Sequence, residues 1–154
     1  MWSKAIIDRT VEDVEYADLN RGSVEELKGM RDYRFLNRVG LNMRELVKRF
    51  GMLRKVYQFY SPAPPMLTSK VDWVLEDFPV RSEIQKIEND VEGMRSMGII
   101  GYDTPSAPGL PYTHFEKLNS VERIIYDIYV IQEGIIVSPK VCGTFYAGEG
   151  DSLD

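Results

Sequence analysis

Three stretches of the chain repeat apolar residues at the spacing of one helix face. In residues 112–133 they follow at intervals of three, four and three, at Leu118, Val121, Ile125 and Ile128. The same intervals occur in two earlier stretches, at Leu36, Val39, Met43 and Leu46, and at Ile84, Ile87, Val91 and Met94. Because an α-helix has 3.6 residues per turn, each set forms one apolar stripe. The pattern predicts three amphipathic helices, around residues 32–50, 81–97 and 113–133.

Local residues predict where these helices begin and end. Thr113 and Glu116 have the spacing of a capping box, which satisfies two free backbone N–H groups at a helix start. Gly134 is expected to end that helix, because glycine readily adopts the left-handed conformation of a helix terminus. Gly51 and Gly98 are expected to end the other two.

Shorter elements are predicted before the first of these helices. Thr10 is followed by acidic residues and should cap a short helix that ends by Gly22. A second turn or short helix is expected from Ser23 through Leu27. Gly40 lies inside the first main helix, where glycine lowers helix stability, so we interpret it as a close-packing point.

Proline-rich stretches separate the helices and should form ordered, extended loops, since proline removes a backbone donor and restricts φ. Within residues 60–79, Trp73 is predicted to be an anchor buried against the helices. Residues 135–154 are expected to be a short β-like arm around Pro139. The arm could fold back or add a strand to a neighbouring subunit, and the second is slightly favoured. Val141, Phe145 and Tyr146 are its candidate partner contacts, although covering the chain's own core would explain Phe145 and Tyr146 equally well.

The three helical stretches also share polar positions. Asn37 and Asn119 occupy equivalent places, as do Glu88 and Glu122. This favours three degenerate copies of one helical unit, although any amphipathic helix fits the apolar spacing. We therefore predict a mainly α fold, a small bundle of three principal helices with short N-terminal helices, in which residues 1–134 form the helical domain and residues 135–154 the arm. The expected fold anchors are Trp73, Leu36, Val39, Ile84, Ile87, Leu118, Val121 and Ile125.

Composition agrees with one globular domain. The 154 residues are 44% hydrophobic and 28% charged, with a formal net charge of −5. An acidic chain is a poor candidate for nucleic-acid binding, which requires clustered positive charge. The basic cluster formed by Arg44, Lys48, Arg49, Arg54 and Lys55 is interpreted as a solvated helix face. The single cysteine excludes an intramolecular disulfide and suits a reducing compartment, and no apolar run is long enough to predict a membrane helix.

No pattern of reactive residues is apparent. The sequence lacks the glycine-rich loops that bind phosphates and the paired motifs that bind zinc. One histidine, His114, and one cysteine, Cys142, cannot form a dedicated zinc site. We therefore predict no catalytic, cofactor-binding or metal-binding residue and no enzymatic activity. An enzyme that uses scattered carboxylates is the alternative that the sequence leaves open.

A series of short motifs is spread along most of the chain: Asp8-Arg9-Thr10, Val14, Leu36-Asn37-Arg38-Val39, Asp72-Trp73, Pro79, Ile84, Ile87, Leu110-Pro111, Leu118-Asn119, Glu122 and residues 143–149. In this order the motifs resemble small virion-associated proteins encoded among the tail and fibre genes of bacteriophages and prophages of Firmicutes. The chain departs from the group at Gly40, which replaces a more usual helix former.

The resemblance implies a non-enzymatic structural component of a phage tail, baseplate or fibre attachment. Its implied partners are other virion subunits, in a homo-oligomer within a symmetric assembly, with no nucleic acid and no membrane. Its implied location is the virion, assembled in the bacterial cytoplasm. A neck or collar component and a soluble cytoplasmic helical adaptor or regulator remain alternatives.

Overall fold

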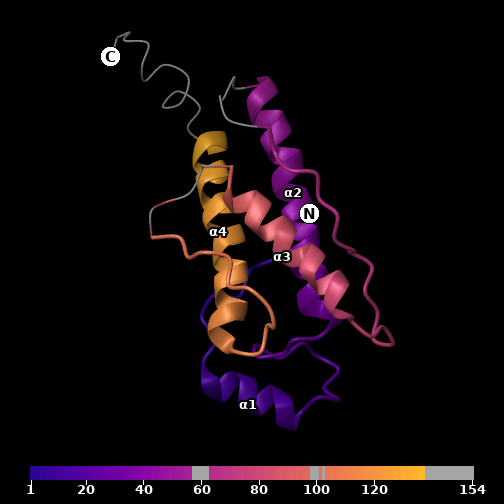
Figure 1. The fold of residues 1–154 in the computed structure, drawn as a ribbon. Coiled ribbons are helices and arrows are strands. Elements are labelled where there is room, and N and C mark those ends of the chain that lie inside the picture. Colours follow the sequence, from indigo (N-terminus) through magenta and orange to yellow (C-terminus); the bar gives the residue numbers. More distant parts are fainter. Residues whose placement is uncertain (57–62, 98–100, 102, 138–154) are drawn as a thin grey trace.

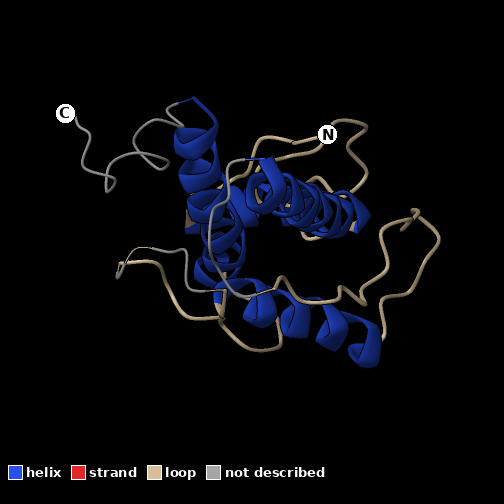
Figure 2. Cartoon of the chain, turned by 90° about the horizontal axis from the view of Figure 1, so that it is seen from above, coloured by secondary structure: helices blue, strands red, loops and turns tan. Residues whose placement is uncertain are grey.

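The chain is mainly helical and forms a small bundle (Figures 1 and 2). The computed structural model describes residues 1–56, 63–97, 101 and 103–137. These contain four helices, α1 (Val11–Leu19), α2 (Tyr33–Val56), α3 (Arg81–Arg95) and α4 (Phe115–Val137), and no strand. The predicted mainly α bundle is therefore confirmed.

The long helices α2 and α4 run side by side in the same direction (Figure 1). Arg38 of α2 contacts Glu122 of α4, and nearer the C-terminal ends of both helices Arg49 contacts Glu133. Because the later residue of α2 contacts the later residue of α4, the two helices are parallel. Helix α3 crosses obliquely and contacts both α2 and α4. Helix α1 lies beyond the N-terminal ends of α2 and α4.

Parallel packing explains why the connecting segments are long. Helix α2 has 24 residues, so it is about 36 Å long, and an extended chain needs about 11 residues to return over that distance. Residues 63–80, which lead into α3, make this return along the outside of the bundle. Extended backbone of this kind has no ladder partner, so its polar groups need side-chain partners.

The apolar stripes of α2, α3 and α4 meet in one core. All eight predicted fold anchors belong to it, with Ile84 partly buried at its edge. Trp73 is buried although it lies in a connecting segment, and its indole N–H donates to the Lys70 carbonyl over 3.2 Å. The N-terminal segment adds Trp2, which stacks on Tyr129 of α4 with ring centroids 4.0 Å apart.

Two local predictions from single residues are confirmed. Thr10 and Asp13 form a complete capping box at the start of α1, where Thr10 Oγ1 accepts from Asp13 N–H and Asp13 Oδ2 from Thr10 N–H. Gly40 is a close-packing point, because a Cβ there would lie 2.8 Å from Cγ1 of Val71 and 3.4 Å from the Lys70 carbonyl.

Two predicted helix ends are wrong. Helix α2 continues through Gly51 to Val56, and α4 continues through Gly134 to Val137. In each case a residue beyond the glycine is buried: Leu53 is fully inaccessible and Ile135 is 6% exposed. Burying such a side chain contributes roughly 1.5–3 kcal/mol, which exceeds the cost of about 1 kcal/mol for a helical glycine.

Two predicted N-terminal features are also absent. Helix α4 begins at Phe115, where the His114 carbonyl accepts the first helical N–H groups, so Thr113 and Glu116 are not in the positions of a capping box. Residues 23–27 have a bend at Val24 and Glu25 and form neither the turn nor the short helix expected there. There the Ser23 hydroxyl donates to the Glu25 carbonyl, a local bond that competes with helix formation.

Candidate functional site

Three asparagines on the helices each hold one residue of an extended segment by both of its backbone groups. In every case the side-chain oxygen accepts the backbone N–H and the side-chain N–H donates to the same residue's carbonyl. The pairs are Asn37 with Trp73, Asn42 with Ser3, and Asn119 with Arg9, with distances of 2.8–3.0 Å. We call these pairs the asparagine clamps. They replace the ladder partners that the extended segments lack.

Two carboxylates of α3 act in a similar way on the other connectors. Asp90 accepts the backbone N–H groups of Thr68 and Ser69, and it is only 4% exposed. Glu88 accepts the Gly109 N–H over 2.9 Å and the Tyr112 hydroxyl over 2.6 Å. Both buried acids therefore serve as acceptors for connecting segments.

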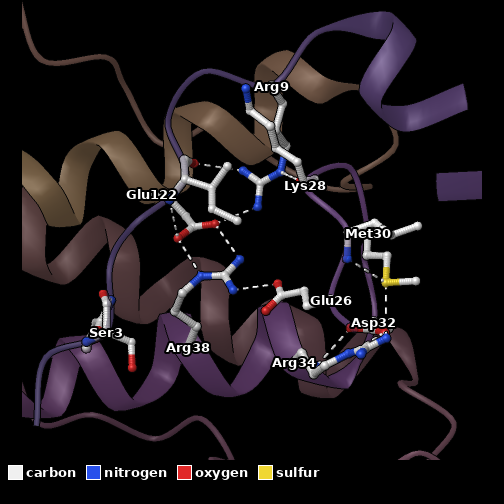
Figure 3. Close-up of polar contacts among 12 residues, drawn as sticks. Ser3, Arg9, Glu26, Lys28, Met30, Asp32, Arg34, Arg38 and Glu122 are labelled. Atoms are coloured by element: carbon white, nitrogen blue, oxygen red, sulfur yellow. Dashed lines mark hydrogen bonds and ion pairs between the residues drawn. The ribbon is translucent and has the colours of Figure 1, made fainter. Parts of the chain in front are cut away.

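A buried polar group surrounds Glu122 and joins α2, α4 and two connecting segments (Figure 3). We call Arg9, Glu26, Arg38 and Glu122 the Glu122 cluster. The Glu122 carboxylate is 1% exposed and accepts four hydrogen bonds, from Ile6 N–H, from Arg9 Nη2 and twice from Arg38. Glu26 binds the far side of Arg38. Four donors match the acceptor capacity of a carboxylate, so Glu122 is saturated.

The two arginines of the cluster respond differently to burial. Desolvation lowers the pKa of Arg9, and the attraction of Glu122 only partly offsets this. Burial also acts to lower the pKa of Arg38, but hydrogen bonds and charge from Glu122 and then Glu26 outweigh it, so that pKa is raised. Arg9 further donates to the carbonyls of Lys28 and Ile6. A guanidinium stays protonated in proteins, so both cations remain charged.

Sequence reasoning did not predict this buried cluster, yet part of it had a signal. Glu122 lies four residues after Leu118 and three before Ile125, so it occupies the apolar stripe itself. Arg38 lies three residues after the buried Phe35 and flanks the stripe of α2. A charged residue at a core position of an amphipathic helix indicates a buried ion pair. Arg9 lies outside any periodic segment and carried no such signal.

A surface groove lies where the N-terminal parts of α2 and α3 meet the segment before α4. We call it the Arg31 groove; it has a volume of about 300 Å³ and is lined by Arg31, Phe35, Leu36, Pro79, Arg81, Ile84, Leu110, Pro111 and Tyr112. Its floor is apolar, and its only charged lining residues are Arg31 and Arg81. Arg31 is engaged by Asp18 and the Thr113 carbonyl, whereas Arg81 is exposed and makes no ion pair within the described residues. The groove thus combines apolar surface with positive charge.

An exposed apolar loop adjoins the groove, immediately before α3. Phe78 is 90% exposed and Leu75 is 73% exposed, and Val74 and Val80 are also exposed. Pro79 of the same segment lines the groove. Clustered exposed apolar side chains are typical of surfaces that bind a partner.

Tyr112 connects the groove to the interior. Its hydroxyl donates to Glu88, and its ring packs edge-on against Phe35 at 6.4 Å between centroids. Burial, together with the hydrogen bond to Glu88 and its negative charge, raises the pKa of the Tyr112 hydroxyl well above its usual value. Tyr112 is therefore a neutral donor that fixes this wall of the groove.

The predicted partner contacts Val141, Phe145 and Tyr146 lie outside the described residues. Over the described ranges no group of three or more His, Cys, Asp or Glu residues has the arrangement of a metal site. Two residues of the basic cluster predicted on α2 make contacts within the fold. Arg49 forms ion pairs with Glu45 and Glu133, and Arg44 donates a hydrogen bond to the Ser69 carbonyl. None of the helices in the described chain is both long enough and apolar enough to span a membrane.

Comparison with protein-family models, curated proteins and solved structures gave no match for this chain.

Proposed function

We propose that this chain is a non-enzymatic structural subunit of a phage tail or phage-tail-like particle, located in the baseplate or fibre-attachment region. It would act by packing against copies of itself and neighbouring virion subunits, so it would be found in the virion after assembly in the bacterial cytoplasm. Residues 138–154 would contribute an extended, β-like arm to a neighbouring subunit, and the proline-rich connectors would supply rigid outer surfaces.

One observation carries this proposal. Six of the residues that carry the sequence resemblance hold the connectors on the bundle. They are Arg9, Asn37, Arg38, Trp73, Asn119 and Glu122, which form two of the three asparagine clamps and most of the Glu122 cluster. Motifs made of fold-holding residues at distant positions support reading the resemblance as a shared architecture.

The chemistry of the buried acids also supports a structural role. A general base needs a free lone pair that can reach a substrate proton. The Glu122 carboxylate accepts four hydrogen bonds, and Asp90 and Glu88 are occupied by backbone and tyrosine donors. These carboxylates hold the connecting segments in place. The candidate contact surface for a partner is the exposed apolar loop beside the Arg31 groove.

The test uses cells that produce the particle with and without this chain. Mass spectrometry of purified particles should detect the chain, and electron microscopy of particles made without it should show tails that lack the baseplate, the fibres or both. Supplying the unmodified chain from a plasmid should restore them. Intact tails with all appendages present in its absence would refute the proposal.

A soluble cytoplasmic adaptor or regulator is the second candidate, and a neck or collar position in the virion is a variant of the first. The exposed loop around Phe78 and Leu75 would serve an adaptor equally well. An adaptor would be absent from purified particles, while a neck component would be present in particles whose defect lies at the head-proximal end of the tail.

A further inference from the structure

We propose that the Arg31 groove binds residues 143–154 of a second copy of this chain, with Phe145 and Tyr146 in the groove. This inference rests on the proposed function, because it names the contact by which copies of the subunit join. It follows from the chemistry of the groove, from the charge of the arm and from the distance that the arm can cover.

The groove has the size and surface for an aromatic side chain. Its volume of about 300 Å³ is at the lower end of the range of small-ligand sites. Pro79, Ile84 and Pro111 supply apolar surface, and Tyr112 is fixed by its bond to Glu88. Aromatic residues are enriched at protein interfaces because they bury a large area in few rotamers.

Charge complementarity selects the acidic arm as the occupant. The charged residues that line the groove, Arg31 and Arg81, are both positive. Within residues 143–154 the aromatic pair is followed by Glu149, Asp151 and Asp154, and this segment contains no lysine or arginine. An aromatic side chain in the groove would place these carboxylates near Arg81, which makes no ion pair within the described residues and could form charge-assisted hydrogen bonds with them. Arg31 is already paired with Asp18 and adds positive charge at the edge of the groove.

The length of the arm favours an intermolecular contact. Helix α4 has 23 residues and is therefore about 34 Å long, with the groove beside its N-terminal end. Phe145 follows the last residue of α4, Val137, by eight positions, and an extended chain of eight residues covers at most about 29 Å. The aromatic pair would reach the groove of its own chain only if the whole segment were fully extended back along α4. A second copy has no such restriction.

Each copy carries one groove and one arm, so two copies can exchange arms reciprocally. Such a two-fold arrangement is closed and satisfies both grooves at once. The exposed loop that contains Phe78 and Leu75 lies beside the groove and would be covered by the same contact.

The unique cysteine of the arm, Cys142, provides a direct test with the full chain. Unmodified protein is mixed with a longer, tagged variant that carries Pro79→Cys and Cys142→Ser, and disulfide formation is followed on non-reducing gels under mild oxidation. A mixed disulfide can then form only between copies, from Cys142 of one chain to position 79 of the other. The matched control carries Lys86→Cys and Cys142→Ser, because Lys86 is exposed on α3 but does not line the groove.

We expect the position-79 variant to form the mixed disulfide at least about tenfold faster than the control, because docking raises the effective concentration of the thiols to about millimolar. Phe145→Ala with Tyr146→Ala in the unmodified partner should remove this advantage. In sedimentation experiments the 17.7 kDa chain should dimerise, and the same double substitution should weaken dimerisation at least about tenfold.

Equal rates for positions 79 and 86, or no effect of the aromatic substitutions, would overturn the inference. Arg81→Glu should weaken dimerisation, and Glu149→Lys with Asp151→Lys should restore it in that background; failure of this rescue would also count against the contact. The particle experiment is independent, since a chain present in purified tails can still lack this particular contact.

Discussion

Substitution of Glu122 by glutamine should be among the most destabilising isosteric changes in this chain. Glutamine keeps the volume of the side chain but removes its charge and replaces one acceptor oxygen with an N–H donor. The buried guanidinium of Arg9, whose side chain is fully inaccessible, would keep the carbonyls of Lys28 and Ile6 and a long hydrogen bond to the Asn119 side-chain oxygen, with no carboxylate beside it. Arg38 would keep Glu26.

The magnitude follows from the burial of both partners. Removing one member of a buried ion pair typically costs about 3–5 kcal/mol, because the other charge stays desolvated without compensation. Domains of this size are stable by roughly 5–15 kcal/mol, so the loss is a large share of the total. With a urea m-value of about 2 kcal/mol per M, the unfolding midpoint should fall by about 1.5–2.5 M.

Glu26→Gln is the matched control, since it makes the same chemical change at a carboxylate that is 25% exposed and binds only Arg38 among the arginines of the cluster. Partial exposure limits its cost to about 1 kcal/mol. Equilibrium urea unfolding, followed by far-ultraviolet circular dichroism, measures both variants. If the two substitutions cost the same within about 1 kcal/mol, the Glu122 cluster does not stabilise the fold in the way argued.

Three further predictions concern single residues. Gly29→Ala should strongly destabilise the fold, because a Cβ there would lie 2.2 Å from the Asp13 carbonyl oxygen. A Cβ at Gly51 would meet nothing within 4 Å, so Gly51→Ala should stabilise α2 by about 0.5–1 kcal/mol. Thermal unfolding measures both variants. Asn119→Ala should lower the free energy of unfolding by about 1–3 kcal/mol, because it leaves the Arg9 N–H and carbonyl unpaired. The control Asn89→Ala, at an exposed position, should lower it by less than about 0.5 kcal/mol, and urea unfolding measures both. Tyr112 should still be protonated when exposed tyrosines ionise, and Tyr112→Phe should flatten the loss of stability at alkaline pH.

The sign of this pH effect follows from linkage. Burial raises the folded-state pKa of the Tyr112 hydroxyl above the unfolded value near 10. The folded state therefore binds more protons than the unfolded state at alkaline pH, and stability falls as the pH rises above about 10. Absorbance at 295 nm should show one of the nine tyrosines ionising only when the protein unfolds. An unchanged pH dependence in the phenylalanine variant would contradict this assignment.

Much of the fold could be predicted because it depends on local periodicity. The stripes through Leu36, Ile87 and Leu118 are buried in the core, and Gly40 packs closely against Val71. Trp73 is buried, as expected of a tryptophan in a polar connector. Helix ends were less predictable, since at Gly51 the packing of residues further along outweighs the local preference of glycine.

The sequence by itself determined the helices, their apolar faces and the positions of the connectors, because each depends on residues within a few turns of one another. Only the tertiary structure decided that α2 and α4 are parallel, that asparagine clamps hold the connectors, and that Arg9 and Arg38 converge on Glu122. These contacts join residues about 36 to 113 positions apart, and nothing in local periodicity specifies which distant segments meet. The physical reason is that the burial of a charge becomes tolerable only when its partners arrive from other parts of the fold.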